Sequence, residues 1–409
     1  MVISRDSASA EAMRGTLVDA LRRHGIVSGE PVEEALRAVP RHLFVPGVPL
    51  PRAYGHEAIT AHRDESGTTL SALPEPGLVA AMLDQLDVRP GHRVLEIGTG
   101  TGYTAALLAR LAGPEGRVTS VDILPGAVAV ARRGLARAGY GHVETAVADG
   151  LLGHAERAPY DRVLVSAGAW DLPPAWADQL APGGVLVAPL RLRGVTRSVA
   201  FTRRDGVWRG RAALSCAPLP LRGPGEVAEH RVVLGDPPVL RLRTDDDRTL
   251  DAAALESALD GPETLVWTGV RPPGGESHLD LHLAALPECC RVLPDLDAVR
   301  AGLLTAALHP WGGPGAATAD SFAYLTRRGI GTSAELGVSA HGPDAPALAD
   351  LLTTRVRTWH TTRHHTLHIN AHPPNTPLPD ATWTIPKHHT TIALHLTPPP
   401  PTPLPTPKP

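Results

Sequence analysis

Residues 94–103 read VLEIGTGTGY, a short apolar strand that runs into a turn with three alternating glycines, Gly98, Gly100 and Gly102. Glycine lets the backbone turn tightly and lets a ligand approach the main chain closely. A helix predicted over residues 101–111 opens in this turn, and its N-terminus offers N–H groups that have no partner within the helix. The stretch therefore predicts a strand–turn–helix unit that binds a ligand.

Strands and helices alternate on both sides of this turn. Alternation at this spacing is typical of an α/β fold with a doubly wound, Rossmann-like parallel sheet. Two later strands with no helix between them indicate an antiparallel hairpin that closes the sheet. The predicted strands are 93–97, 117–121, 143–147, 161–166, 184–190, 196–203 and 206–214, and the predicted helices are 101–111, 126–138 and 176–180.

Acidic residues at the ends of successive strands narrow the kind of ligand. Glu96 lies two residues before the first glycine, and Asp122 ends the second strand, where an acid can accept hydrogen bonds from both ribose hydroxyls. Asp149 follows the third strand, where it can meet an adenine amino group. Tyr103 stands where a dinucleotide fingerprint has its third glycine, which argues against NAD. Ordinary turn residues would explain one such feature, but three in register favour a nucleoside-bearing cofactor.

The glycine turn with its downstream acids resembles class I methyltransferases, and the flanking sequence is similar to a narrower group. Residues 39–46 (VPRHLFVP), residues 53–54 (AY) and residues 67–71 (GTTLS) resemble the N-terminal lead-in of protein-L-isoaspartate O-methyltransferases. The resemblance covers about residues 32–214, half of the chain. It implies S-adenosyl-L-methionine as the cofactor and a carboxylate on a peptide or protein as the methyl acceptor. The expected cofactor-binding residues are Glu96, Gly98, Thr99, Gly100, Gly102, Asp122, Asp149 and Gly150.

The resemblance also implies a substrate-binding residue. A carboxylate is already an anionic nucleophile at neutral pH, so catalysis consists of aligning it with the methyl group and excluding water. In the family, a serine of the segment that GTTLS resembles hydrogen-bonds this carboxylate, and the matching residue is Ser71. Counting back from the helix expected near Pro76 places Pro74 there instead, and an insertion of residues 72–74 reconciles the two counts. Ser71 is the predicted catalytic residue, Thr69 is the second candidate, and a simple loop serine is the alternative.

The chain is long enough for two domains and a tail. We expect an N-terminal helical cap with the substrate loop (1–87), a cofactor-binding methyltransferase core (88–220), a smaller α+β accessory domain (221–360) and a poorly ordered Thr-, His- and Pro-rich tail (361–409). Within the accessory domain, residues 232–242 read as one strand and residues 295–308 as one helix.

The chain continues for nearly two hundred residues after the predicted sheet, whereas the resemblance implies that repair enzymes end soon after it. Residues 168–176 and 189–194 are similar to extended homologues found with FxLD-type lanthipeptides and other ribosomally made peptides. This resemblance implies methylation of aspartate in a precursor peptide, with an ester that can collapse to a succinimide. General isoaspartate repair, methylation of a small molecule and a non-catalytic cofactor-binding partner are the alternatives. The extension is expected to bind peptide, or else to buttress the sheet or mediate dimerisation.

Composition excludes several classes of protein. The formal net charge of −3 creates no bulk field toward nucleic acid or anionic membrane, so neither is an expected partner. Three cysteines fit neither a disulfide framework nor a metal site, and no metal is expected. The N-terminus lacks the apolar core of a signal peptide and no run is long enough to span a bilayer, which predicts a soluble, cytoplasmic protein. The oligomeric state stays open.

Overall fold

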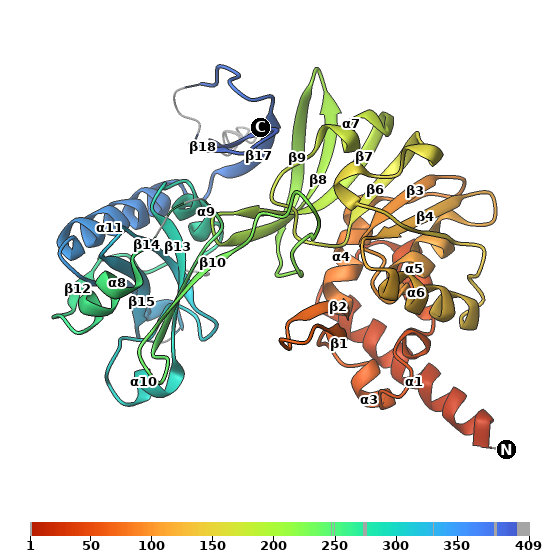
Figure 1. Ribbon diagram of the computed structural model, residues 1–409, viewed down its shortest axis with the longest axis horizontal. Helices are drawn as coiled ribbons and strands as arrows, with labels where there is room; N and C mark the ends of the chain where they lie inside the picture. The colour runs from red at the N-terminus through yellow and green to blue at the C-terminus, as the bar shows by residue number, and fades with distance from the viewer. Residues whose placement is uncertain are drawn as a thin grey trace, which may run out of the picture.

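The computed structural model describes residues 2–246, 248, 250–272, 276–329, 331–379 and 383–398, which form two lobes (Figure 1). The lobe that holds the N-terminus is built on a ten-stranded sheet, and the other lobe on a seven-stranded sheet. In spatial order the strands of the larger sheet are β18 (Trp383–Pro386), β19 (Thr391–Thr397), β17 (Thr366–His372), β9 (Val207–Ser215), β8 (Val195–Arg204), β7 (Leu180–Leu192), β6 (Tyr160–Val165), β3 (Arg93–Ile97), β4 (Arg117–Asp122) and β5 (Glu144–Val147).

The predicted doubly wound sheet is confirmed. β3, β4, β5, β6 and β7 run parallel to one another, and β8 and β9 form the predicted antiparallel hairpin beside β7. Both faces of β3 and β6 are buried, which explains their largely apolar sequences, whereas Val147 of the edge strand β5 is 53% exposed. In β6, Val163 and Val165 belong to one hydrophobic core, while Leu164 between them points into the other.

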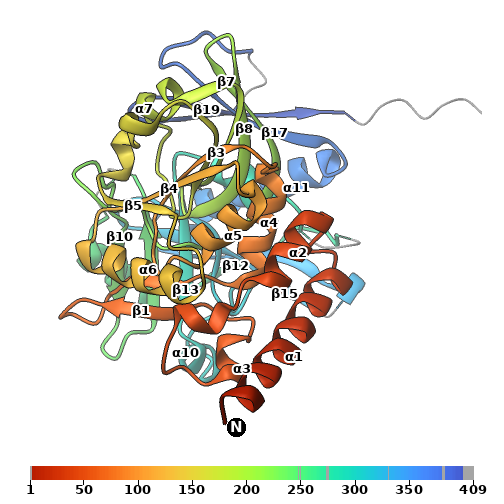
Figure 2. The same ribbon diagram turned by 90° about the vertical axis from the view of Figure 1, so that its right-hand side faces the viewer.

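Helices cover both faces of this sheet. α1 (Val2–Arg23), α2 (Glu30–Ala38), α4 (Pro76–Leu86) and α5 (Tyr103–Ala112) share one core, and Figure 2 shows α2 lying beside α1, α4 and α5. α6 (Pro125–Arg137) packs along β4 and β5, and α7 (Pro174–Asp178) buries Trp176 in the core on the opposite face. α5, α6 and α7 agree with the predicted helices 101–111, 126–138 and 176–180 to within a few residues.

The segment between α2 and α4 contains only short elements. It contains the short helices η1 (Arg41–Phe44) and α3 (Leu50–Ala53), followed by an antiparallel hairpin of β1 (Ile59–Arg63) and β2 (Thr69–Leu73). This hairpin carries the GTTLS segment, and it projects beside the carboxyl edge of the parallel strands.

The second lobe is an α+β unit, as predicted. Its antiparallel sheet has the order β10 (His230–Leu234), β11 (Leu240–Thr244), β13 (Cys289–Pro294), β14 (Gly313–Ala317), β15 (Phe322–Arg328), β16 (Glu335–His341) and β12 (Thr264–Trp267). Its helices are α8 (Ala252–Leu259), α9 (Leu279–Ala284), α10 (Leu296–Arg300) and α11 (Ala345–Thr362). The long α11 covers β12, β15 and β16 (Figure 1).

Two predicted elements of this lobe are wrong. The single strand over residues 232–242 is a hairpin, in which Leu234 pairs with Leu240 across a turn that begins at Gly235 with φ +83°. Residues 235–238 read GDPP and interrupt the apolar pattern, so this local turn signal outweighs the periodicity of the residues on either side. The predicted helix over residues 295–308 stops after Arg300, because Gly302 adopts φ +73°, outside the helical region.

The prediction of a poorly ordered tail from residue 361 is also wrong where the structure describes it. α11 continues to Thr362, and β17, β18 and β19 extend the larger sheet beyond β9. Ile369 and Ala371 of β17 and Ile392 and Leu394 of β19 are buried and form the apolar face of these strands. The many Thr and His residues around them make this alternation hard to recognise in the sequence. Residues 399–409, where proline dominates, lie outside the described residues. The other domain boundaries remain a prediction, and they fall in connections between elements.

No helix in the described ranges has the length and apolar character needed to cross a bilayer.

Candidate active site

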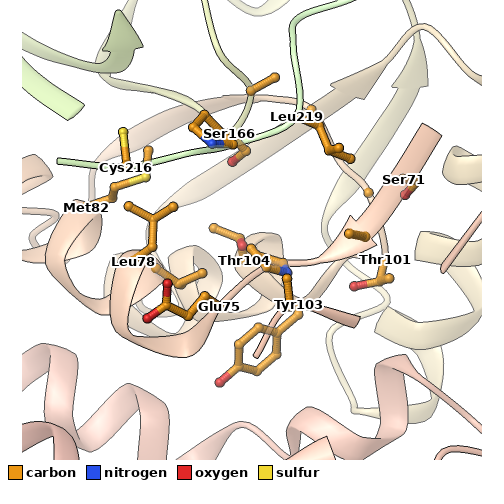
Figure 3. A pocket seen from close by; sticks show the side chains of 18 of the residues that line it. Ser71, Glu75, Leu78, Met82, Thr101, Tyr103, Thr104, Ser166, Cys216 and Leu219 are labelled. Carbon is orange, nitrogen blue, oxygen red and sulfur yellow. The ribbon is translucent and has the colours of Figure 1, made fainter. Parts of the chain in front are cut away.

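The order of the parallel strands creates a crevice at one edge of the sheet. β3 has β4 on one side and β6 on the other, so successive connections leave the carboxyl ends of β3 and β6 in opposite directions. Ligands of open α/β sheets bind at such a switch point. A cavity of about 980 Å³ lies there, lined by the turn after β3, the ends of β4 and β6, the β1–β2 hairpin, the start of α4 and residues 214–222 (Figure 3).

The glycine turn forms one wall of this cavity. Gly98, Gly100 and Gly102 have φ angles of +98°, +54° and +89°, a region that favours glycine. Gly98, Thr99 and Gly100 line the cavity, as does Thr101, whose buried Oγ1 has no partner among the described residues. Gly102 faces α6 instead, since a Cβ there would lie 3.1 Å from the Cα of Ala131. Its absent side chain permits close helix packing.

Asp122 stabilises the glycine turn by hydrogen bonds and also lines the cavity. The Gly100 N–H donates to its Oδ2 at 3.0 Å, and the Leu124 N–H donates to its Oδ1 at 3.0 Å. A carboxylate oxygen accepts more than one hydrogen bond, so both oxygens can still accept from ligand hydroxyls.

Glu96 supports the turn from beneath and is not one of the described residues that line the cavity. Its fully buried carboxyl accepts hydrogen bonds from Ser120 Oγ at 2.5 Å and Ser166 Oγ at 3.2 Å. Ser120 Oγ also lies 2.7 Å from Thr99 Oγ1, which links Glu96 to the turn. Burial raises the pKa of Glu96 to about 8, so the neutral carboxylic acid predominates at neutral pH. The structure therefore favours a supporting role over the predicted direct contact with the cofactor.

Asp149 and Gly150 follow β5, and only one of these two residues lines the cavity. Gly150 lines the cavity, and its carbonyl oxygen accepts a hydrogen bond from Trp176 Nε1 at 2.8 Å. Asp149 is absent from the described lining, and its Oδ1 accepts from the Leu151 N–H at 3.0 Å. Gly223 covers it, because a Cβ on that glycine would lie 3.1 Å from Asp149 Oδ1.

Ser71 lies on the cavity wall next to the glycine turn. It is a buried residue of β2, and its side chain has no hydrogen bond to any other described residue. A Cβ on Gly100 would be 3.7 Å from Ser71 Oγ, and Figure 3 shows Ser71 on the same side of the cavity as Thr101. Thr69 is on the same face of the strand but half-buried, and its Oγ1 lies 3.5 Å from Thr60 Oγ1. This geometry favours Ser71 over Thr69 and over Pro74.

The VPRHLFVP segment supports this wall and is not among the described residues that line the cavity. Arg41 is almost completely buried, and its guanidinium donates to the carbonyl oxygens of Ala53 at 2.9 Å and Pro74 at 2.6 Å. The guanidinium carbon also lies 5.1 Å from the centre of the Tyr103 ring. Arg41 therefore ties the connection between β2 and α4 to the helix that follows the glycine turn.

Sequence reasoning missed the segment that closes the cavity, residues 214–222. It is held to the loop after β6, since the Gly168 N–H donates to Leu219 O and the Leu221 N–H donates to Gly168 O. Burial raises the pKa of Cys216 to about 11, which keeps this cavity thiol protonated. Arg222 brings a positive charge to the cavity wall, and its buried Nε has no hydrogen-bond partner in the described ranges. The proline-rich sequence directly after β9 was the available signal.

Comparison with known proteins decides the family. The family model described as protein-L-isoaspartate(D-aspartate) O-methyltransferase matches residues 12–223, about half of the chain. This chain belongs to that family. The protein-L-isoaspartate O-methyltransferase of Methanopyrus kandleri is 40% identical over 223 residues, which cover 54% of this chain and 96% of that protein. The Hyperthermus butylicus enzyme of the same name is 38% identical over 229 residues, covering 54% and 92%.

Family membership makes the chain an S-adenosyl-L-methionine-dependent methyltransferase, as predicted. A solved structure named protein-L-isoaspartate O-methyltransferase aligns with 94% of this chain and 99% of its own length, with a TM-score of 0.51 and 21% identity. The shared fold thus extends beyond the matched half into the second lobe. The Methanopyrus kandleri and Hyperthermus butylicus relatives, in contrast, are almost completely covered by about half of this chain, so they end soon after the sheet, as the resemblance implied. Within the described ranges, no group of three or more His, Cys, Asp or Glu side chains is arranged to hold a metal ion.

Proposed function

We propose that this enzyme methylates the carboxylate of an aspartyl or isoaspartyl residue in a peptide or protein, and that Ser71 positions this carboxylate. The observation that carries the proposal is the Ser71 hydroxyl, which is unpaired among the described residues and lies beside the glycine turn in the large cavity. A hydroxyl at this point can donate to an anionic substrate oxygen.

The cavity wall fits the cofactor. Gly98 and Gly100 expose main chain where a side chain would intrude, and Thr101 Oγ1 is a buried polar atom without a described partner. We propose that these residues and Thr99 contact the cofactor, that Asp122 accepts from the ribose hydroxyls, and that Gly150 lies beside the base. When bound, S-adenosyl-L-methionine supplies the methyl group that becomes an ester on the carboxylate oxygen.

The residues around Ser71 need to do little chemistry. The substrate carboxylate is ionised at neutral pH and requires no general base. Ser71 fixes one of its oxygens, Arg222 favours the approach of an anion, and the segment 214–222 shields the reacting atoms from water. The raised pKa of Cys216 makes this thiol a poor nucleophile, so direct transfer to the carboxylate fits the site better than a covalent relay.

For the biological substrate we propose an aspartate in a ribosomally made precursor peptide, with general isoaspartate repair as the second candidate. The first rests on the resemblance of residues 168–176 and 189–194 to extended homologues. In the fold these segments join the lobes, because Trp170 Nε1 donates to Asp245 O and Arg191 donates to Val227 O. The second is favoured by the solved structure named protein-L-isoaspartate O-methyltransferase, which aligns along nearly the whole chain.

Mass spectrometry of two peptide sets tests the proposal. Precursor-type peptides with aspartate and ordinary peptides with isoaspartate are incubated with the full-length enzyme and S-adenosyl-L-methionine. Gain of one methyl group on the aspartyl set, followed by loss of methanol to a succinimide, supports precursor modification. Methylation of the isoaspartyl set alone supports repair. Cofactor binding with no transfer to either set would overturn carboxyl methylation and favour a non-catalytic partner protein.

A further inference from the structure

A second cavity of about 380 Å³ lies where the two lobes meet. One wall comes from the β8–β9 hairpin of the N-terminal, catalytic lobe. The other wall comes from the second lobe: the start of α9 with the residues before it, β13, and the segment that leads into β14. Leu214 and Ser215, at the end of β9, line this cavity and also the large cavity that contains Ser71. The two cavities therefore adjoin across the end of one strand.

Exposed apolar side chains mark this second cavity. Trp311 is 64% exposed and Leu214 is 38% exposed, although both are large hydrophobic residues. The Trp311 ring stacks on His309, with ring centres 5.0 Å apart and an interplanar angle of 8°. Arg291 donates to the carbonyl oxygen of Trp311 at 3.0 Å, which holds the backbone that carries this ring. An exposed, supported aromatic surface with polar neighbours is typical of a contact for a polypeptide.

The walls of this cavity are held together before any ligand binds. Arg197 of β8 donates two hydrogen bonds to the carboxylate of Asp280 on α9, at 2.5 and 2.7 Å. One hydrophobic core runs from the parallel strands into α9, α11 and the second sheet. A preformed groove binds an extended chain at a smaller entropic cost than one that must assemble.

We propose that this inter-lobe cavity binds the part of the substrate polypeptide that flanks the methylated residue, with an apolar side chain of that polypeptide against Trp311. The inference rests on the proposed function, because the occupant is the substrate of the Ser71 site. The shared lining residues Leu214 and Ser215 argue for this occupant, since a polypeptide with its carboxylate at Ser71 can reach the adjoining cavity across the end of β9. Binding energy gained in this cavity lowers KM for long peptides and leaves kcat unchanged, because the reacting groups stay the same.

Steady-state kinetics on two substrates test this inference. One is a short peptide with only the methyl-accepting residue and its neighbours, and the other carries the same residue within a long peptide rich in apolar side chains. For Trp311→Ala we expect KM to rise about tenfold for the long peptide, as for truncation of a central interface aromatic, with kcat unchanged. Both constants for the short peptide should stay at wild-type values. Trp311→Phe should restore most of the loss.

Leu303→Ala provides the matched control, because Leu303 is 68% exposed in the same lobe but does not line the cavity. It should leave both substrates unaffected. An unchanged KM for the long peptide in Trp311→Ala, or an equal loss for both peptides, would overturn the inference while leaving carboxyl methylation intact. A Trp311→Ala variant that changes its mass in solution would assign the surface to a second copy of the chain. No methylation of either peptide by the wild type would instead contradict the proposed function.

Discussion

Ser71 is the residue on which the chemistry depends most directly. For Ser71→Ala we expect kcat/KM to fall about 10- to 100-fold, because a hydrogen bond to a charged group contributes roughly 1.5–3 kcal/mol. Affinity for S-adenosyl-L-methionine should change by less than about twofold, since the hydroxyl is proposed to contact only the substrate. Initial rates and calorimetric cofactor titration measure the two effects.

Thr69→Val is the control for this prediction. Thr69 lies on the same strand face but farther from the turn, so its loss should reduce kcat/KM much less. A Thr69→Val variant that loses more activity than Ser71→Ala would assign the carboxylate contact to Thr69.

Gly100 is constrained both by its backbone and by its surroundings. Its φ is +54°, and a Cβ would lie 3.3 Å from Ala72 O on the cavity wall. For Gly100→Ala we expect cofactor affinity to fall at least about tenfold, because the added methyl group shifts the turn against β2. Gly139→Ala is the matched control, since Gly139 has φ +82° but an added Cβ would have no described atom within 4 Å. It should lower the midpoint of thermal unfolding without weakening cofactor binding, and equal weakening in both variants would contradict the assigned contact.

Glu96 gives the stability of the enzyme a pH dependence. Its pKa is raised from 4.5 to about 8 by burial, so between these values the folded chain keeps a proton that the unfolded chain releases. Unfolding then releases a proton, and the free energy of unfolding falls as pH rises through this window. Glu96→Gln removes the titration, so its free energy of unfolding should depend less steeply on pH in urea unfolding series. Glu115→Gln, at an exposed glutamate, should keep the wild-type slope, and identical slopes for all three proteins would refute the assignment.

At the scale of elements, prediction succeeded where a local pattern decides the structure. β3 has its predicted bounds, and α5 and β4 lie within two residues of theirs, because a parallel strand buried on both faces and a glycine turn leave unmistakable runs. Prediction failed for β17 and β19, because these strands join the sheet through β9, which lies more than 150 residues earlier in the chain. Asn370 of β17, for example, pairs with Arg209 of β9. Composition rich in Thr, His and Pro carried no sign of that partner.

Asp171 fixes these late strands to the catalytic sheet. Its carboxylate accepts hydrogen bonds from the Thr390 hydroxyl at 2.6 Å, from the His389 N–H at 2.5 Å and from the Leu172 N–H at 2.7 Å. For Asp171→Ala we expect a loss of about 2–4 kcal/mol in the free energy of unfolding, because buried donors are left without an acceptor. Urea unfolding measures the loss. Asp178→Ala, at an exposed aspartate of α7, should change stability by less than about 0.5 kcal/mol, and a similarly small effect at Asp171 would show that it does not anchor the strands.

At the scale of the molecule, the sequence was sufficient to predict the cofactor-binding half of the site, because residues close together in the chain form it. The turn and Asp122 follow directly from the order of the strands. Ser71 was predicted by resemblance, but its place beside the turn depends on the complete fold, and Arg222 after β9 was not predicted at all. The placement of Glu96 beneath the turn was also out of reach, because a strand pattern does not state which face becomes a cavity wall.

The two lobes share a hydrophobic core, so we expect them to unfold together. Arg197 and Asp280 join them through a pair whose side chains are 7% and 31% exposed. Arg197→Ala leaves the partly buried Asp280 without its partner, which should lower the free energy of unfolding by about 2–3 kcal/mol. The transition seen by calorimetry should remain single, because the core formed by β7, β8, α9 and α11 still links the lobes. Arg300→Ala breaks an ion pair with Asp297 that is 74% and 86% exposed, and it should cost less than about 0.5 kcal/mol.

Two resolved transitions in the wild type would show that the lobes are energetically separate. In that case the inter-lobe cavity would not be preformed, and the loss from Trp311→Ala should then include the cost of docking one lobe on the other.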